Sequence, residues 1–164
     1  MYEAIYLSGK GVEMKLAEAL IIRSDLQTQN TQLRERLNRS AKVQEGEKPY
    51  EDPEALLQEL DRVSEELQLM ICRINKTNHE TMVTETLTLA DMLVRRDILI
   101  NKRKTFKSLM ESASSSGTRY SRSEIKMLST VNVEKLQKQS DQLSKQIRET
   151  DTKIQEKNWL VELL

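Results

Sequence analysis

The chain has 164 residues, of which 37% are hydrophobic, 32% are charged and 4% are aromatic, and its formal net charge is zero. With four glycines and two prolines, this composition argues against a β-sandwich and favours long helices with polar outer faces. No run reaches the roughly 18 apolar residues of a membrane span, and no signal peptide is recognisable, so we expect neither membrane insertion nor secretion. The single cysteine, Cys72, cannot form an internal disulfide, which favours a cytoplasmic location.

The zero net charge hides an uneven distribution of charge. Residues 1–88 contain 11 Lys and Arg against 16 Asp and Glu, residues 89–133 contain 9 against 4, and residues 134–164 contain 6 against 6. The acidic first half and the basic third quarter predict that charge guides how these segments associate, within one chain or between copies.

Residues 1–13 differ in composition from the rest of the chain, since they hold two of its four tyrosines and two of its four glycines. A helical pattern begins at Met14, and Lys10-Gly11-Val12 can be encoded by a bacterial ribosome-binding sequence. We therefore hypothesise that 1–13 is a mis-started extension, with a flexible N-terminal tail as the alternative. Residues 14–164 are predicted to form a single helical coiled-coil domain.

The first predicted helix covers residues 14–40. Its apolar side chains follow the heptad spacing of a coiled coil, and Arg23 and Asn30 interrupt them. Residues 42–52 are rich in charge and contain a glycine and a proline, which predicts a loop. The apolar heptad positions of the helix are Leu16, Ala19, Leu26, Leu33 and Leu37.

The second predicted helix covers residues 53–78. Asp52 is a suitable N-cap, Pro53 suits the first helical position, and Glu54 places an acid in the first turn. The apolar stripe steps by four and three without a break and places Leu67 at its centre. It comprises Leu56, Leu60, Val63, Leu67, Met70, Ile74 and Thr77, and Leu57 and Ile71 widen it.

The third predicted helix covers residues 88–113 and follows a threonine-rich connector at 79–87. Thr88 and Asp91 resemble a capping box with Asp in place of Glu. The stripe is weaker here, because apolar pairs alternate with polar pairs at 96–97 and 103–104.

Residues 114–132 form the longest break in the helical pattern, and a β-prone stretch within 119–131 predicts a short strand or an extended segment. Asn132 is a suitable N-cap for a fourth helix that runs from residue 133 towards the C-terminus. One heptad frame runs through this helix, comprising Val133, Leu136, Leu143, Ile147, Ile154, Val161 and Leu164.

These elements predict an all-α fold of elongated antiparallel helical hairpins, which together form a four-helix, coiled-coil-like bundle. Connectors between helices of similar length favour antiparallel neighbours. A sustained 3.5-residue repeat implies supercoiling against a partner helix.

The fourth helix carries polar residues in its apolar seam, at Ser140, Thr150 and Lys157. Polar seam positions suit an edge that meets solvent or a second copy of the protein, and they restrict register and partner number. We therefore expect a homo-oligomer. Its predicted interface residues are Leu143, Ile147, Ile154 and Val161.

Basic residues gather between positions 95 and 126 and form a candidate anion-binding segment. A basic helix followed by a loop with arginines and Tyr120 could bind phosphate groups. The neutral chain and its acidic helices favour pairing within the chain or between subunits over nucleic-acid binding. The candidate residues are Arg95, Arg96, Arg103, Lys107, Arg119, Arg122 and Lys126.

The sequence offers no converging groups for catalysis. Its one histidine, His79, and its one cysteine, Cys72, lie seven residues apart, about 10 Å along a helix, which is too far for a thiolate–imidazole pair. The two cannot supply a zinc site, the glycines do not form a phosphate loop, and no Glu-x-x-His motif for a di-metal site occurs. We expect no enzyme activity, no catalytic residue, no cofactor and no metal.

From Met14 onward the sequence resembles the septicolysin-like family of small bacterial helical proteins. The resemblance rests on "MKLAEALIIRSDLQTQNTQLRERLNRSAKVQEGE", "EDPEALLQEL", "RYSRSEIKMLSTVNVEKLQKQ" and "DTKIQEKNW", which are spread over most of residues 14–164. The family label implies a cytolytic, membrane-active protein, and the resemblance brings no catalytic residues with it.

Three functions follow from these observations. We expect a non-enzymatic, oligomeric coiled-coil protein with a structural or interaction role in the cytoplasm, with itself or an unidentified protein as partner. The resemblance implies the alternative of a membrane-active, pore-forming protein, although the chain shows no membrane-inserting segment. The basic segment 95–126 gives a third alternative, weak nucleic-acid binding.

Overall fold

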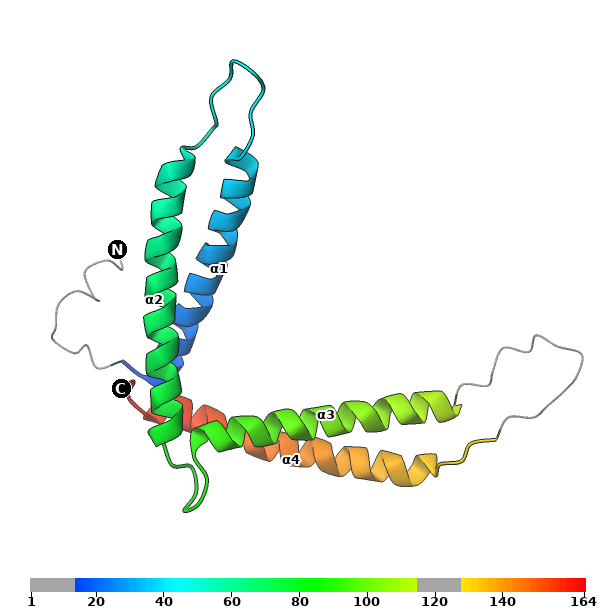
Figure 1. Ribbon diagram of the computed structural model, residues 1–164. Helices are drawn as coiled ribbons and strands as arrows, with labels where there is room; N and C mark the ends of the chain where they lie inside the picture. The colour runs from blue at the N-terminus through cyan, green and yellow to red at the C-terminus, as the bar shows by residue number, and fades with distance from the viewer. Residues whose placement is uncertain (1–13, 115–127) are drawn as a thin grey trace, which may run out of the picture. The chain divides into compact units, whose positions relative to one another are not determined.

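The computed structural model describes residues 14–114 and 128–164, and these residues form an all-α fold (Figure 1). The helices are α1 (Leu16–Ser40), α2 (Pro53–Glu80), α3 (Leu89–Ser114) and α4 (Val133–Leu160). The predicted fold class is therefore confirmed. The hypotheses on residues 1–13 and most of the predicted β segment lie outside the described residues, and residues 128–131 form no strand.

The described chain divides into two compact units. Unit 1 contains residues 14–82 and 157–164, and unit 2 contains residues 83–114 and 128–156. In unit 1 the helices α1 and α2 run antiparallel, and in unit 2 α3 and α4 do the same (Figure 1). The expectation of one domain over residues 14–164 stays a prediction.

The seam of unit 1 is built from side chains spaced seven residues apart on both helices. In α1 the residues Ala19, Leu26, Leu33 and Ser40 are at most 8% exposed, and in α2 the residues Leu56, Val63, Met70 and Thr77 are at most 4% exposed. This spacing repeats after two helical turns, so each helix presents one row of side chains to the other. The predicted apolar heptads therefore form the core of a two-helix coiled coil.

Along most of the seam the heptad positions between these rows are only half-buried, whereas Leu16 and Ile74 at one end are buried. The half-buried positions include Arg23, Asn30, Leu60 and Leu67, so the prediction that Leu67 lies at the centre of the buried face is wrong. One of these positions makes a polar link between the helices, because Asn30 Nδ2 donates to Ser64 Oγ at 3.0 Å.

The loop between α1 and α2 is closed by specific local contacts. Gly46 has a φ of 90°, a left-handed conformation that glycine adopts without steric cost, and the nearby Glu47 N–H donates to the Gln44 carbonyl at 3.0 Å. Asp52 caps α2 as predicted, since its Oδ1 accepts from the Glu54 N–H at 3.1 Å. The predicted boundaries of α2 hold except that it extends to Glu80, which places the exposed His79 within its last turn.

The residues before α1 pair with the C-terminal residues of the chain in an antiparallel bridge. The Leu16 N–H donates to the Val161 carbonyl at 2.9 Å, and the Leu163 N–H donates to the Met14 carbonyl at 2.8 Å. These bonds hold Lys15 in an extended conformation, with a ψ of 149°, which is why α1 begins at Leu16 and not at the predicted Met14. We call residues 14–16 and 160–164 the terminal clasp.

The terminal clasp is also bonded to α2. Thr77 Oγ1 accepts from the Leu164 N–H at 3.0 Å and donates to the Arg73 carbonyl at 2.9 Å, and Arg73 Nε donates to the Leu164 carbonyl at 3.0 Å. Thr77 is fully buried, so its hydroxyl needs both partners. The end of the chain is thereby fixed between the start of α1 and the last turns of α2.

The seam of unit 2 is more polar than that of unit 1. In α3 only Leu89 and Met92 are buried, at 0% and 3% exposure. The buried residues of α4 that lie in this unit are Ser140, Leu143, Thr150 and Ile154. The apolar core of unit 2 therefore lies mainly near the start of α3. That start is capped as predicted, with Thr88 and Asp91 bonded to each other.

Candidate interaction surfaces

The predicted oligomer interface on α4 is partly covered within the chain itself. Leu143 is 7% exposed and Ile154 is 2% exposed, so these two side chains leave little surface for a second copy. Ile147 and Val161 are half-buried. The four residues share one heptad frame, as the sequence indicates, but they do not form an open apolar stripe.

Two arginines of α3 contact polar side chains of α4 that lie beside its seam. Arg96 Nη1 lies 3.9 Å from Asp151 Oδ1, and Arg103 Nη1 donates to Ser144 Oγ at 3.4 Å. These two contacts fit one antiparallel register, because both pairs of residue numbers add up to 247. The small side chain of Ser144 leaves room for the long stem of Arg103.

The sequence predicts that the polar seam residues of α4 lie at an edge that meets solvent or a second copy, but Ser140 is only 9% and Thr150 only 5% exposed within the single chain. The Thr150 hydroxyl donates to the Gln146 carbonyl at 2.8 Å, which satisfies it within its own helix. Lys157, the third polar position, is half-buried. The contacts of α3 arginines with polar side chains of α4 were not predicted from the sequence. The spacing of seven residues between Arg96 and Arg103 was the available signal.

The candidate anion-binding residues do not form one free basic surface. Arg96 bonds Asp97 at 3.0 Å in addition to its contact with Asp151, and Lys107 lies 3.8 Å from Glu111. Arg95 is exposed. Arg119, Arg122 and Lys126 lie outside the described residues. Several of the charges that would attract phosphate are thus already paired with acids of the same unit.

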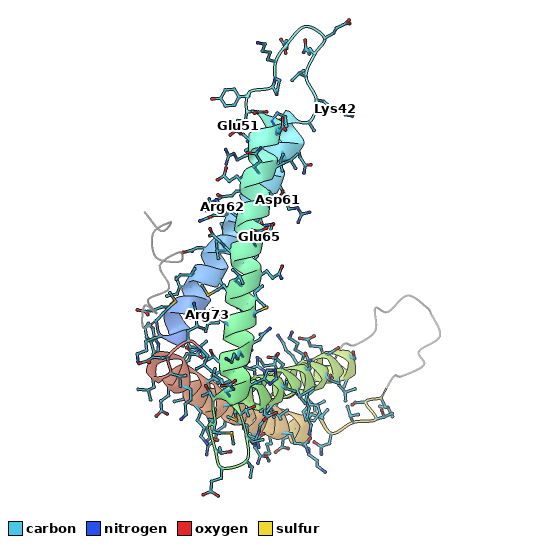
Figure 2. All side chains as sticks on the ribbon, turned by 60° about the vertical axis from the view of Figure 1, so that its left-hand side comes forward. Lys42, Glu51, Asp61, Arg62, Glu65 and Arg73 are labelled. Atoms are coloured by element: carbon cyan, nitrogen blue, oxygen red, sulfur yellow. The ribbon has the colours of Figure 1, made fainter. Side chains whose placement is uncertain are left out.

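Unit 1 carries an ion cluster beside the loop that joins α1 to α2. Arg36 Nε donates to both carboxylate oxygens of Glu51, at 3.0 and 3.2 Å, and Arg36 Nη1 lies 3.8 Å from Glu59. The hydrogen bonds from Arg36 lower the pKa of Glu51, and the same bonds raise the pKa of Arg36. This bidentate pair fixes the loop to α1, and Figure 2 labels Glu51 beside the top of α2.

Large apolar side chains are exposed on the outer faces of the helices. On α3, Val94 is 63% and Ile98 is 61% exposed, and near the end of α4, Trp159 is 60% and Leu160 is 62% exposed. Contiguous exposed apolar side chains are characteristic of protein–protein contact sites. The sequence contained the signal for the α3 pair, a step of four residues outside the seam, but the weak stripe of this helix concealed it.

The groups that could carry chemistry are dispersed. Cys72 and His79 are both exposed. Within the described ranges 14–114 and 128–164, no three residues among His, Cys, Asp and Glu gather closely enough to hold a metal ion. None of the helices in those ranges has the length and apolar character that crossing a membrane requires.

Comparisons with known proteins place the chain among proteins of unknown role. The model of DUF6847, a family of unknown function, matches residues 23–163. The chain is also similar to a functionally unknown conserved protein from Corynebacterium diphtheriae, whose crystal structure shares 40% sequence identity and a TM-score of 0.86. That match covers 93% of this chain and 99% of the other. No curated protein matches the chain.

These comparisons correct the resemblance drawn from the sequence. The family model that covers most of the chain is DUF6847, and neither it nor the similar structure points to a septicolysin-like family. The assignment to that family is wrong. Charged, heptad-patterned helices resemble one another across unrelated families, because the solvated faces of such helices draw on the same few residue types.

Proposed function

The chain belongs to DUF6847, a family of unknown function, and from this premise we propose that it is a non-enzymatic coiled-coil protein with a structural or interaction role that works as a homo-oligomer. The cytoplasm is its proposed location, which the free, exposed thiol of Cys72 supports. Neither nucleic acid nor a membrane is its proposed partner.

One observation carries this proposal, the exposure of large apolar side chains on helices that are otherwise highly charged. Val94, Ile98 and Leu69 are each more than 60% exposed. Charged residues make up 32% of the chain, so charged side chains are abundant for exposed positions such as these. Leaving such side chains in water forgoes roughly 25 cal/mol for each Å² that could be buried. Contact with another protein surface recovers this free energy.

The size of the protein in solution tests the proposal. Light scattering coupled to gel filtration, on the full chain at 5 to 100 μM, should give a mass at least twice that of the 19.1-kDa chain at the upper end. The mass should fall on dilution if the contact is of moderate strength. A mass of one chain throughout this range contradicts the homo-oligomer.

The pairing of Arg96 and Lys107 with acids of unit 2 supports the choice of a protein partner over nucleic acid. Binding through Arg95 and its neighbours would show a gel shift that weakens steeply between 50 and 200 mM salt. We expect no shift at micromolar protein at either salt concentration. A shift that Arg95→Ala and Arg103→Ala together abolish would favour the nucleic-acid function instead.

A further inference from the structure

We propose that a second copy of the chain docks with the outer face of its α2 against the outer face of α3. This inference rests on the proposed homo-oligomer and names the surfaces that would make it. Two exposed stripes carry the argument, one on each helix. The α2 stripe comprises Leu57, Asp61, Glu65, Leu69 and Cys72, and the α3 stripe comprises Val94, Ile98, Lys102 and Leu109.

Both stripes lie outside the seams of their own hairpins. Leu57 is 50% and Leu69 is 65% exposed on α2, while Leu109 is 40% exposed on α3, where Val94 and Ile98 are more exposed still. Steps of three and four residues keep each stripe on one side of its helix. Each is therefore a continuous surface that could receive another helix.

The charges of the two helices are complementary. From Pro53 to Glu80, α2 contains six acidic and three basic residues, whereas from Leu89 to Ser114, α3 contains three acidic and six basic residues. Opposite net charges on facing surfaces favour encounter of the two helices and oppose contacts of α2 with α2 or of α3 with α3. This asymmetry selects a contact between unlike helices.

The order of side chains along the stripes fits an antiparallel contact. Residues 57 to 72 and residues 94 to 109 span the same number of positions, about 22 Å of helix. Placing Leu57 opposite Leu109 puts Cys72 opposite Val94. Glu65 then lies beside Lys102, and Leu69 beside Ile98. In this register apolar pairs flank a central ion pair.

The central pair is available for such a contact. Glu65 and Lys102 are both exposed, and among residues 14–114 and 128–164 neither makes a salt bridge. Lys102 Nζ lies 5.8 Å from the centre of the Phe106 ring, which leaves its charge at the surface. Figure 2 labels Asp61 and Glu65 along α2. The proposal includes a two-fold axis between the copies, by which the contact is made twice and the assembly closes as a dimer.

Charge reversal tests the inference. Glu65→Lys and Lys102→Glu, measured separately by light scattering over a dilution series, should each weaken dimerisation about tenfold, because each places like charges opposite each other twice per dimer. An equimolar mixture of the two variants should restore the dimer, since each mutant face then meets its complement. Lys104→Glu is the matched control, with the same change on an exposed residue of α3 outside the stripe, and should leave the dimer unchanged.

The outcomes separate this inference from the proposed function. A wild-type protein that is monomeric throughout contradicts both. If the wild-type protein is an oligomer that neither charge reversal weakens, or if mixing the two variants does not restore the dimer, the α2–α3 contact is wrong. The proposed homo-oligomer is not contradicted by either result.

A disulfide test fixes the register independently. Val94→Cys should form a disulfide between copies with the natural Cys72 under mild oxidation, which a non-reducing gel shows as a band of two chains. Val94→Cys combined with Cys72→Ser should lose that band. An undiminished band in the double variant, or a bond formed within one chain, overturns the proposed register between copies.

Discussion

The hairpins of unit 1 and unit 2 share a heptad spacing but fill it with different side chains. In unit 1 the buried rows are almost entirely apolar, from Leu26 and Leu33 on α1 to Val63 and Met70 on α2. In unit 2 the arginines of α3 meet serine and aspartate side chains of α4. The same periodicity can therefore encode a dry seam or a polar one, and the residues at the heptad positions decide which.

This difference predicts unequal stability. Full burial of a leucine or valine side chain contributes about 1.5 to 3 kcal/mol, whereas a partly exposed ion pair contributes about 0 to 1 kcal/mol. Unit 1 also has the terminal clasp, in which the two ends of the described chain are bonded to each other and Leu164 is bonded to α2. We therefore expect unit 2 to open more readily than unit 1.

The largest expected effect comes from breaking the apolar seam of unit 1. Val63 is 1% exposed, so Val63→Asp buries a carboxylate without a partner and should cost about 3 kcal/mol or more. Leu67→Asp is the comparison, because this half-buried side chain can turn its charge towards water. Urea unfolding followed by circular dichroism should show the smaller loss for Leu67→Asp, and equal losses would refute the alternation of closed and open positions.

The next effect comes from the buried hydroxyl that holds the terminal clasp. Thr77→Val removes a buried hydroxyl and should cost about 1 to 3 kcal/mol, because its hydrogen bonds to the Leu164 N–H and the Arg73 carbonyl are both lost. Thr31→Val is the matched control. Its hydroxyl donates to the Gln27 carbonyl at 3.0 Å but is exposed, so the change should stay within about 0.5 kcal/mol. Similar unfolding midpoints for the two variants would mean that the terminal clasp contributes little to the stability of the fold.

A change in unit 2 should act in the opposite direction. Arg96→Met replaces a charged seam residue with an apolar one of similar length and should stabilise unit 2 by up to about 1 kcal/mol, because no guanidinium remains to be desolvated. Thermal unfolding at pH 7 measures this. A loss of more than about 2 kcal/mol would show that the arginine contacts hold the hairpin together, contrary to the account of a polar and weaker seam.

The smallest expected effect is a pH dependence in unit 1. Because Arg36 lowers the folded-state pKa of Glu51, this pair stabilises the fold above the unfolded pKa of about 4.3, and the contribution is lost as the pH falls through the folded pKa. Glu51→Gln should therefore lower the melting temperature more at pH 7 than at pH 3. Glu66→Gln, at the exposed pair with Arg62, provides the control for a general effect of removing an acid. A difference for Glu51→Gln that is equal at both pH values would rule out the ion pair as its cause.

Local signals in the sequence predicted the helices closely. Asp52 and Pro53 marked the start of α2, and Thr88 with Asp91 marked the start of α3, because capping depends on neighbouring residues that the sequence displays. Asn132 Oδ1 accepts from the Lys135 N–H at 2.8 Å, as expected of the N-cap of α4.

Features that depend on distant residues were not predictable in the same way. The bond between Leu163 and Met14 joins the two ends of the described chain and involves backbone groups, which carry no side-chain signature. The burial of Leu143 and Ile154 within the chain depends on which helix faces α4, and the heptad pattern does not name that partner. A stripe of apolar residues predicts that another surface packs against it. Which helix provides that surface is known only from the three-dimensional structure.

Amide hydrogen exchange tests most directly the claim that unit 1 has the more stable seam. With exchange read by mass spectrometry at neutral pH, amides in the Val63–Ile74 stretch of α2 should exchange at least about tenfold more slowly than those in residues 101–110 of α3, because the α2 stretch contains three buried side chains and the α3 stretch contains none. Equal protection of the two stretches, or slower exchange in α3, would contradict the account.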